Sequence, residues 1–236
     1  MDLIYHMKDM LLHSLLHIAV GACLAYLIGN KKSDSLAVRG LLLLFGGIAG
    51  LSPDFTKAFG DLYGHSLGLV PVFGLLFAWA YRRIRKDIPF PIAWLLFSAA
   101  VLSHLFIDTV GNGNALFYPF IEREYEFAIL RKADDFSLAI LLLSMIGGLL
   151  TRRGKRIVAA GALLVGVYLA SLSYSKLALE HELASRYEED GVEFVLTYPG
   201  EMRRGWEFMV RTKDAFITGH SSVLKVDPQI EDVNEF

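Results

Sequence analysis

Residues 88–108, IPFPIAWLLFSAAVLSHLFID, form an apolar run that ends at a charged residue. Residues 88–107 carry no Asp, Glu, Lys or Arg, and about 20 apolar residues are the length of an α-helix that crosses a bilayer. His104 and Asp108 are four positions apart at the end of this run, so they share one side of the helix. Ionisable residues inside membrane segments are rare and mark functional sites. The stretch therefore predicts a membrane-spanning helix with a site at one end.

Similar apolar runs recur along the chain of 236 residues, 54% of which are hydrophobic and 20% charged. The others lie at roughly 10–28, 38–51, 66–81, 136–150 and 157–175. The sequence therefore predicts a mainly α-helical, polytopic membrane bundle of about six segments, with the lipid bilayer as its partner. Cys23 is the only cysteine, which excludes disulfides and thiolate metal clusters. Without a dense basic stripe, we expect no nucleic-acid partner.

Basic residues concentrate in three short loops. The stretches 31–39, 82–86 and 152–156 hold 11 of the 17 Lys and Arg residues that precede residue 177. In a six-segment bundle these are the first, third and fifth loops, and the positive-inside rule makes that side cytoplasmic. The N-terminus lacks signal-peptide features, so the first run is expected to be a retained membrane segment. We therefore expect a multi-pass protein of the inner or plasma membrane, with both termini extracytoplasmic.

The composition becomes polar after Lys176. Residues 1–176 have a net charge of +5, whereas 177–236 have a net charge of −7. Residues 177–191 indicate a helix that leaves the membrane and ends at Gly191, and alternating apolar and polar residues then predict a small antiparallel β unit. The last ten residues read as an acidic, mobile tail. Two domains are thus expected: 1–176, membrane-spanning with the candidate site, and 177–236, a polar acidic extension.

Other ionisable residues fall at the same outer ends of the predicted segments. They are His17 in the first run, Asp54 after the second, His65 at the start of the third, and Asp134 and Asp135 before the fifth. Imidazole and carboxylate ligands suit a divalent metal ion, with zinc favoured and manganese or iron as alternatives. Such an ion lowers the pKa of water from ~15.7 towards ~7 and polarises a carbonyl or phosphoryl oxygen.

Each candidate also has a structural interpretation. Asp54 in LSPDF fits a turn, His17 fits a hydrogen bond to a neighbouring helix, and Asp61 fits a solvated loop. Either Asp134 or Asp135 fits a helix N-cap. The roles of Asp61, Asp134 and Asp135 stay open at this point, and GNGN (111–114) fits a tight turn better than a phosphate-binding loop.

Together these residues resemble a known family. The stretches HIAVGACLA (17–25), GLSPDFT (50–56), GHSLG (64–68) and HLFIDTVGNGNALFYPF (104–120) are similar to recurring elements of the YdjM-like family of inner-membrane-associated proteins, described as metal-dependent hydrolases and as LexA-binding. The resemblance covers roughly residues 10–150. The chain departs from the family pattern at two places. Thr56 stands where the family has a second aspartate in the turn, and Gly60-Asp61 stands where the family has a His-Arg pair. The metal ligands it implies are His17, Asp54, His65, His104 and Asp108.

Three functions are compatible with these patterns. The first is an integral membrane metal-dependent hydrolase at the outer membrane–water interface, acting on a phosphodiester or ester of a lipid-linked substrate, with Asp54 or Asp108 as general base. The second is a non-catalytic membrane protein whose His/Asp cluster binds or conducts ions or serves regulation. The third is a structural anchor that displays the acidic β unit.

Overall fold

The computed structural model describes residues 2–57, 63–200 and 205–236. Its contacts divide the chain into two compact units. Unit 1 comprises Met1–Phe127 with Lys132–Val165, and unit 2 comprises Ala128–Arg131 with Gly166–Phe236. The division after Val165 falls inside one continuous helix, α7 (Gly154–Arg186), which contributes to both units.

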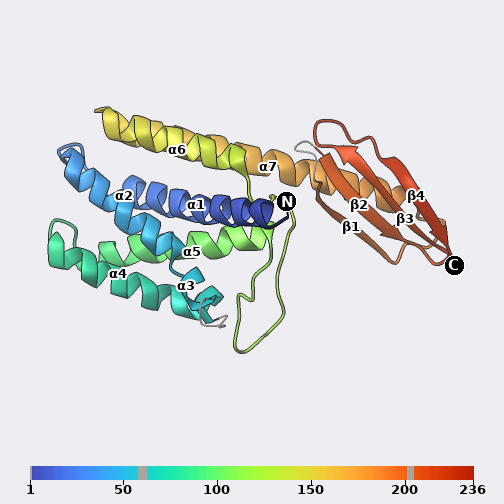
Figure 1. The fold of residues 1–236 in the computed structure, drawn as a ribbon, viewed down its shortest axis with the longest axis horizontal. Coiled ribbons are helices and arrows are strands. Elements are labelled where there is room, and N and C mark those ends of the chain that lie inside the picture. The colour runs from blue at the N-terminus through green and yellow to red at the C-terminus, as the bar shows by residue number, and fades with distance from the viewer. Residues whose placement is uncertain (1, 58–62, 201–204) are drawn as a thin grey trace. The chain divides into compact units, whose positions relative to one another are not determined.

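Unit 1 is a bundle of apolar helices that follow the predicted runs (Figure 1). In chain order its elements are α1 (Asp2–Gly29), α2 (Leu36–Leu51), α3 (Asp54–Lys57), η1 (Tyr63–His65), η2 (Leu67–Leu69), α4 (Val70–Ile84), α5 (Phe90–Gly111), α6 (Asp135–Leu150) and the first part of α7. The predicted mainly α fold with a small antiparallel sheet is confirmed.

Among the described residues, four stretches of helix are long and apolar enough to cross a membrane: Met7–Gly29, Leu67–Ile84, Phe90–Gly111 and Gly154–Arg186. Helices α2 and α6 are apolar but shorter. The predicted number of about six membrane segments is therefore approximate, and it depends on how these two shorter helices meet the bilayer.

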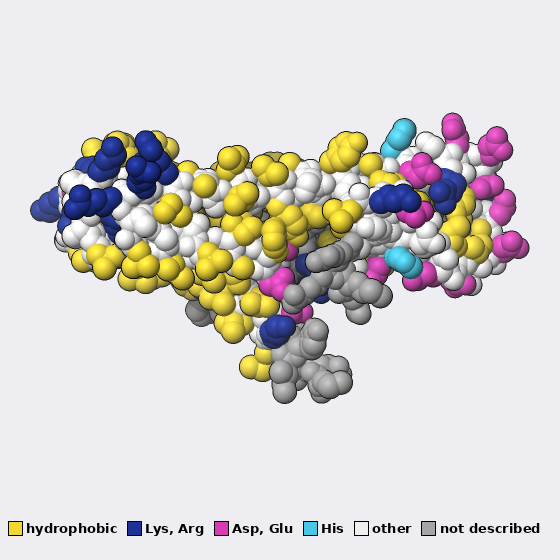
Figure 2. Space-filling model, turned by 90° about the horizontal axis from the view of Figure 1, so that it is seen from above, with side chains coloured by type: hydrophobic (Ala, Val, Ile, Leu, Met, Phe, Trp, Pro, Cys, Tyr) yellow, Lys and Arg dark blue, Asp and Glu magenta, His cyan; other side chains and the backbone are white. Residues whose placement is uncertain are grey.

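The outward surface of these helices is apolar as well. Leu44, Leu95 and Leu143 are 56%, 67% and 69% exposed, and hydrophobic side chains cover much of the helical surface seen in Figure 2. A helix of a soluble protein would turn a polar face outward. The apolar exterior fits a surface in contact with lipid.

The three basic loops meet at one end of unit 1. Lys31 Nζ donates to the carbonyl oxygen of Asp87 at 3.0 Å, which joins the first and third loops. Arg39 donates to the carbonyl oxygen of Thr151 at 3.1 Å, which joins α2 to the fifth loop. Dark blue side chains gather at this end in Figure 2. The arrangement agrees with the prediction that these loops share one side of the bundle.

Glycines let α1 and α2 approach closely. A Cβ at Gly46 would lie 2.3 Å from Ala25 Cβ and 2.7 Å from the Gly21 oxygen, and a Cβ at Gly50 would lie 2.6 Å from the His17 oxygen. Since real Cβ atoms do not come so close, only glycine fits at Gly46 and Gly50, the small-xxx-small pattern of membrane helix pairs. This contact sets the turn of α1 that carries His17 against the end of α2.

The GNGN stretch closes α5 and turns the chain back, as the tight-turn interpretation expects. The backbone N–H groups of Asn112 and Gly113 both donate to the backbone carbonyl oxygen of Asp108 at 2.8 Å. Gly113 has φ of +85°, a conformation that glycine adopts without strain. Further along, Phe127 N–H donates to the Thr109 oxygen at 2.8 Å. The returning segment is thus tied to the last turns of α5.

Unit 2 combines the second part of α7 with an antiparallel sheet of order β1-β2-β3-β4. The strands are β1 (Phe194–Pro199), β2 (Gly205–Arg211), β3 (Ala215–Ser222) and β4 (Gln229–Glu235). Trp206, Phe208 and Val210 alternate along β2 and are buried. Trp206 Nε1 donates to Ser175 Oγ of α7 at 2.9 Å, so α7 covers this face of the sheet.

Two details of the predicted extension are wrong. The C-terminal residues form β4, paired antiparallel with β3, and are not a free tail. Every residue of β4 is exposed, so backbone hydrogen bonds hold the strand and hydrophobic alternation gives little sign of it. Helix α7 ends at Arg186 and not at Gly191, because the acidic stretch 188–190 would face the negative end of the helix dipole.

We predict that Gly46→Ala destabilises unit 1, because the new Cβ would meet Ala25 and Gly21. Overpacking of this kind costs about 1–3 kcal/mol. Gly40→Ala is the matched control on the same helix, since nothing lies within 4 Å of its Cβ position. Thermal unfolding in detergent should show a lower midpoint for Gly46→Ala and an unchanged or slightly higher one for Gly40→Ala. Equal midpoints would contradict this account of the α1–α2 contact.

Candidate metal centre

The structure brings the predicted site residues together at the end of the bundle away from the basic loops. Helix α1 contributes His17, α3 begins with Asp54, η1 ends with His65, and α5 contributes His104 and Asp108. His13, one turn before His17, joins them. All except Asp54 are buried.

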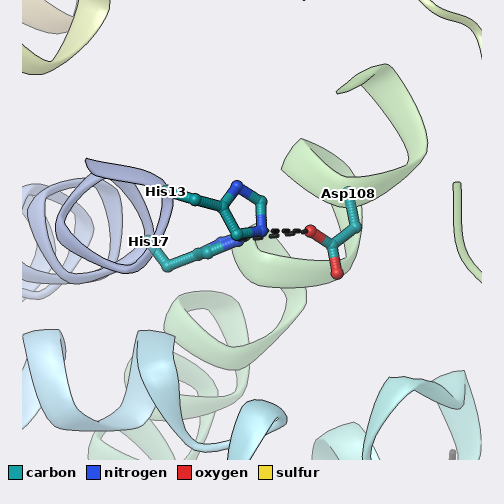
Figure 3. Close-up of side chains that lie close together, drawn as sticks. All are labelled: His13, His17 and Asp108. Carbon is teal, nitrogen blue, oxygen red and sulfur yellow. Dashed lines mark hydrogen bonds and ion pairs between the residues drawn. The ribbon is translucent and has the colours of Figure 1, made fainter. Parts of the chain in front are cut away.

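Asp108 lies at the centre of the cluster. Its Oδ1 is 3.3 Å from His13 Nε2 and 3.2 Å from His17 Nε2, and these two ring nitrogens are 3.0 Å apart. Figure 3 shows both rings on α1 pointing at one oxygen of the carboxylate on α5. The contact joins two helices that are far apart in the sequence.

The other oxygen of Asp108 faces a second pair of histidines. Oδ2 is 3.5 Å from His65 Nε2 and 3.2 Å from His104 Nε2, and these nitrogens are 3.2 Å apart. Asp54 Oδ1 lies 3.4 Å from His65 Nε2 and 3.6 Å from His104 Nε2. Each carboxylate oxygen of Asp108 therefore has its own pair of imidazoles.

Backbone carbonyls orient two of the rings. His13 Nδ1–H donates to the Lys132 oxygen at 2.9 Å, and His104 Nδ1–H donates to the Gly50 oxygen at 2.8 Å. A neutral imidazole with its proton on Nδ1 has its lone pair on Nε2. That lone pair can accept a hydrogen bond from a neighbouring imidazole, since His13 Nε2 is 3.0 Å from His17 Nε2 and His104 Nε2 is 3.2 Å from His65 Nε2. A carbonyl acceptor at Nδ1 is also the support that metal-binding histidines have.

These contacts show that the cluster could hold a cation. The Nε2 atoms of His13 and His104 lie 3.3 and 3.2 Å from carboxylate oxygens, and an unprotonated ring nitrogen and a carboxylate oxygen at that distance repel unless a proton or metal ion lies between them. Neither oxygen of Asp108 has a hydrogen-bond partner among the described residues. The nitrogen and oxygen donors fit zinc, manganese or ferrous iron.

Three overlapping groups among the described residues could hold a metal ion, with their ligand atoms within 4.8 Å of one another. They are His13, His17 and Asp108; His17, Asp54 and His104; and His65, His104 and Asp108.

The cluster opens to its surroundings on the side of α3. Asp54 and Lys57 have side chains that are 21% and 43% exposed, whereas that of Asp108 is fully buried. Lys57 Nζ lies 3.0 Å from Asp54 Oδ1. Burial raises the pKa of the Asp54 carboxyl, but its hydrogen bond with His65 and the Lys57 ammonium outweigh burial and hold that pKa well below the usual range. Asp54 is therefore ionised at neutral pH.

Local hydrogen bonds place His65. Ser66 Oγ donates to the Tyr118 oxygen at 2.6 Å and accepts from Gly68 N–H at 3.2 Å, which fixes the start of η2 against the 112–127 segment. Thr56 Oγ1 donates to the Pro53 oxygen at 3.0 Å and accepts from Gly64 N–H at 3.2 Å. Thr56, which stands where the resembling family has an aspartate, thus joins the residue before Asp54 to the residue before His65.

Other candidates have different roles or positions. Asp134 is the N-cap of α6 and accepts from Ser137 N–H at 2.8 Å, as expected for one residue of that pair. Neither Asp134 nor Asp135 belongs to the potential metal groups found among the described residues. Asp61 lies outside the described residues.

His13 and Lys57 were not among the residues singled out as ligands. His13 and His17 show the same four-residue spacing as His104 and Asp108 in the sequence, but a position of His13 at the head-group level fitted that pattern as well. Lys57 gives no such signal, because a loop lysine is an ordinary surface residue and its contact with Asp54 depends on the α3 turn.

A family profile described as YdjM inner membrane protein matches residues 12–179. This chain belongs to the YdjM inner membrane protein family. The match spans α1 to α7 and includes every residue of the cluster. Comparison with curated proteins and with solved structures gave no match. The family and the apolar helices support a membrane location for the chain.

We predict that the purified protein binds a divalent ion through this cluster. Asp108→Asn keeps the shape of the side chain but removes its charge, so bound zinc after loading and desalting should fall at least tenfold. His104→Ala removes a second ligand and should also lower the zinc content. Its matched control is His220→Ala, because His220 is exposed and pairs with Glu231 at 2.8 Å. Elemental analysis measures the metal. Equal zinc contents in the control and both cluster variants would contradict the assignment.

Proposed function

We propose that the chain is an integral membrane metal-dependent hydrolase that acts at the outer membrane–water interface on a phosphodiester or ester of a lipid-linked substrate. The observation that supports this most is the convergence of the histidine pairs on the two oxygens of Asp108, beside the more open Asp54. A divalent ion held there supplies Lewis acidity, which polarises a carbonyl or phosphoryl oxygen and lowers the pKa of nearby water.

The residues divide by their access to substrate. Asp108 is fully buried among imidazoles, so we assign it to metal binding. Asp54 is partly exposed and ionised, so it is the carboxylate that can accept a proton from water at the site. Lys57 is the most exposed group of the three, and its ammonium is suited to hold an anionic phosphate. This favours a phosphodiester over a neutral ester.

The position of the cluster supports an interfacial substrate. Helix α5 begins at Phe90, after the basic loop that contains Asp87, and ends at Gly111, beside the cluster. The cluster and the basic loops therefore lie at opposite ends of the bundle. With the basic end cytoplasmic, the cluster and both termini would be extracytoplasmic, at a depth where lipid head groups reach the site.

The burial pattern speaks against an ion conduit. Between the cluster and the basic end, the core contains Leu42, Leu96, Phe97 and Val101, each fully buried. Among the described residues of this stretch, no buried carboxylate, imidazole or basic side chain continues from the cluster until Arg39 at the basic end. A proton or ion path would need such groups along its length. A one-sided site explains the pattern better.

The hydrolase proposal predicts metal-dependent turnover by the purified protein. Fluorogenic phosphodiester and carboxylic ester lipids in detergent micelles should be cleaved after zinc or manganese loading and left intact after chelation. His104→Ala should reduce the rate at least a hundredfold, and His220→Ala should retain it. A folded, metal-loaded protein that cleaves neither class of substrate would count against the proposal.

The orientation is tested separately by cysteine labelling in a Cys23→Ser background. Ser33→Cys lies in the first basic loop, Glu124→Cys in the segment after α5, and Leu224→Cys in the exposed turn after β3. In right-side-out membrane vesicles, an impermeant maleimide should label Glu124→Cys and Leu224→Cys, and should label Ser33→Cys only after permeabilisation. Labelling of Ser33→Cys in sealed vesicles would contradict the proposed orientation and indicate the opposite one.

A further inference from the structure

We infer that the cluster holds two divalent cations, with Asp108 as their shared ligand. His13 and His17 would bind the first ion with Oδ1, and His65 and His104 would bind the second with Oδ2. This inference rests on the proposed function, because it concerns the same site, and it adds His13 to the ligands expected from the sequence.

The separations between ligand atoms support two compact sites. Metal–ligand bonds of ~2.0–2.1 Å at tetrahedral angles put neighbouring ligand atoms about 3.3–3.4 Å apart. In the first group, the three atoms of His13, His17 and Asp108 are 3.0, 3.2 and 3.3 Å apart. In the second group, the atoms of His65, His104 and Asp108 are 3.2, 3.2 and 3.5 Å apart. Each triangle has the size of one face of a tetrahedral site.

The groups differ in what completes them. Asp54 Oδ1 lies 3.4 Å from His65 Nε2 and 3.6 Å from His104 Nε2, so one oxygen of Asp54, the proposed proton acceptor, lies within similar reach of the second group. In the first group, the structure shows three protein ligands, His13, His17 and Asp108, and all three are buried. Three protein ligands with an open position are typical of catalytic zinc sites.

Both groups contain one histidine fixed by a backbone carbonyl. In the first, His13 Nδ1 donates to Lys132, and in the second, His104 Nδ1 donates to Gly50. Carbonyl acceptors of this kind fix the ring orientation of metal-binding histidines. The two carbonyls come from different parts of the chain, so each group of ligands has its own backbone support.

A single ion would leave part of this arrangement unused. The group of His17, Asp54 and His104 could hold one ion between the two triangles. His13 Nε2 and His65 Nε2 would then contact only His17 Nε2 and His104 Nε2, at 3.0 and 3.2 Å, and would bind no metal. Two ions account for all of these contacts.

Two ions also narrow the class of substrate. Two divalent cations carry +4, whereas Asp54 and Asp108 together carry −2. Lys57, whose Nζ is 3.0 Å from Asp54, adds a further positive charge. A site with this excess favours an anionic group, and two-metal sites occur in phosphatases and nucleases. A lipid-linked phosphodiester therefore fits better than a neutral ester.

The test is the metal-to-protein ratio of the whole chain in detergent, measured by elemental analysis after zinc loading and removal of free metal. We expect two ions per wild-type chain. His13→Ala removes a ligand of the first group only, so one ion should remain. His65→Ala removes a ligand of the second group only and should also leave one. His220→Ala, the matched control, should retain two.

A spectroscopic measurement complements the ratio. After manganese loading, two ions that share a carboxylate should give an exchange-coupled electron paramagnetic resonance spectrum, and His13→Ala should give that of an isolated ion. Circular dichroism and gel filtration check the fold of each variant. The metal-to-protein ratio of the wild-type chain tests the inference even if a variant fails to fold.

The outcomes separate this inference from the proposed function. One ion per wild-type chain would overturn the two-ion site and leave a mononuclear hydrolase standing. Two ions that persist in folded His13→Ala would also overturn it, because the second ion would then lie elsewhere. No bound ion in the folded wild-type protein would overturn both proposals.

Discussion

The burial of the Asp108 carboxylate is the constraint on which unit 1 depends. A carboxylate in an apolar bundle costs several kcal/mol unless charge or hydrogen bonding compensates it, and no hydrogen bond to its oxygens is found among the described residues. The imidazoles of α1, η1 and α5 surround it at 3.2–3.5 Å. Lys57 Nζ lies 3.9 Å from Asp108 Oδ2 as a further positive group. Those elements must therefore converge around the carboxylate, and their ligand atoms lie close enough together to hold a metal ion.

Close contact between the helices fixes the positions of the side chains in the cluster. At the α1–α2 crossing, Gly50 fits against the His17 carbonyl, and the Gly50 oxygen then accepts the proton of His104 Nδ1. One glycine thus links the approach of two helices to the orientation of a ring on a third. On the opposite side, Ser66 ties the residue after His65 to the Tyr118 carbonyl. Rigid supports of this kind hold the donor atoms in place before a ligand arrives.

The two ends of the bundle have different chemistry. Lys31 and Arg39 join the basic loops at one end, while the cluster and its more exposed Asp54 and Lys57 lie at the other. The apolar core between them, with Leu96 and Phe97 at its centre, separates the two ends. This asymmetry is the feature from which we infer the membrane orientation: a cluster that opens at one end of the bundle is accessible from one face of the bilayer.

The sequence by itself determined the helices and most of the cluster, because membrane segments follow from local apolar runs and because His104 and Asp108 repeat with the helical period. It also predicted the first strands of the β unit from alternation. Tertiary structure decided the rest. The contact of His13 with Asp108 joins residues far apart in the chain. The bond from Gly64 to Thr56 and the pairing of β4 with β3 span shorter stretches, but they too depend on how the chain folds back. Local patterns do not encode such contacts, so the division of the histidines between the two oxygens of Asp108 emerges only when the helices meet.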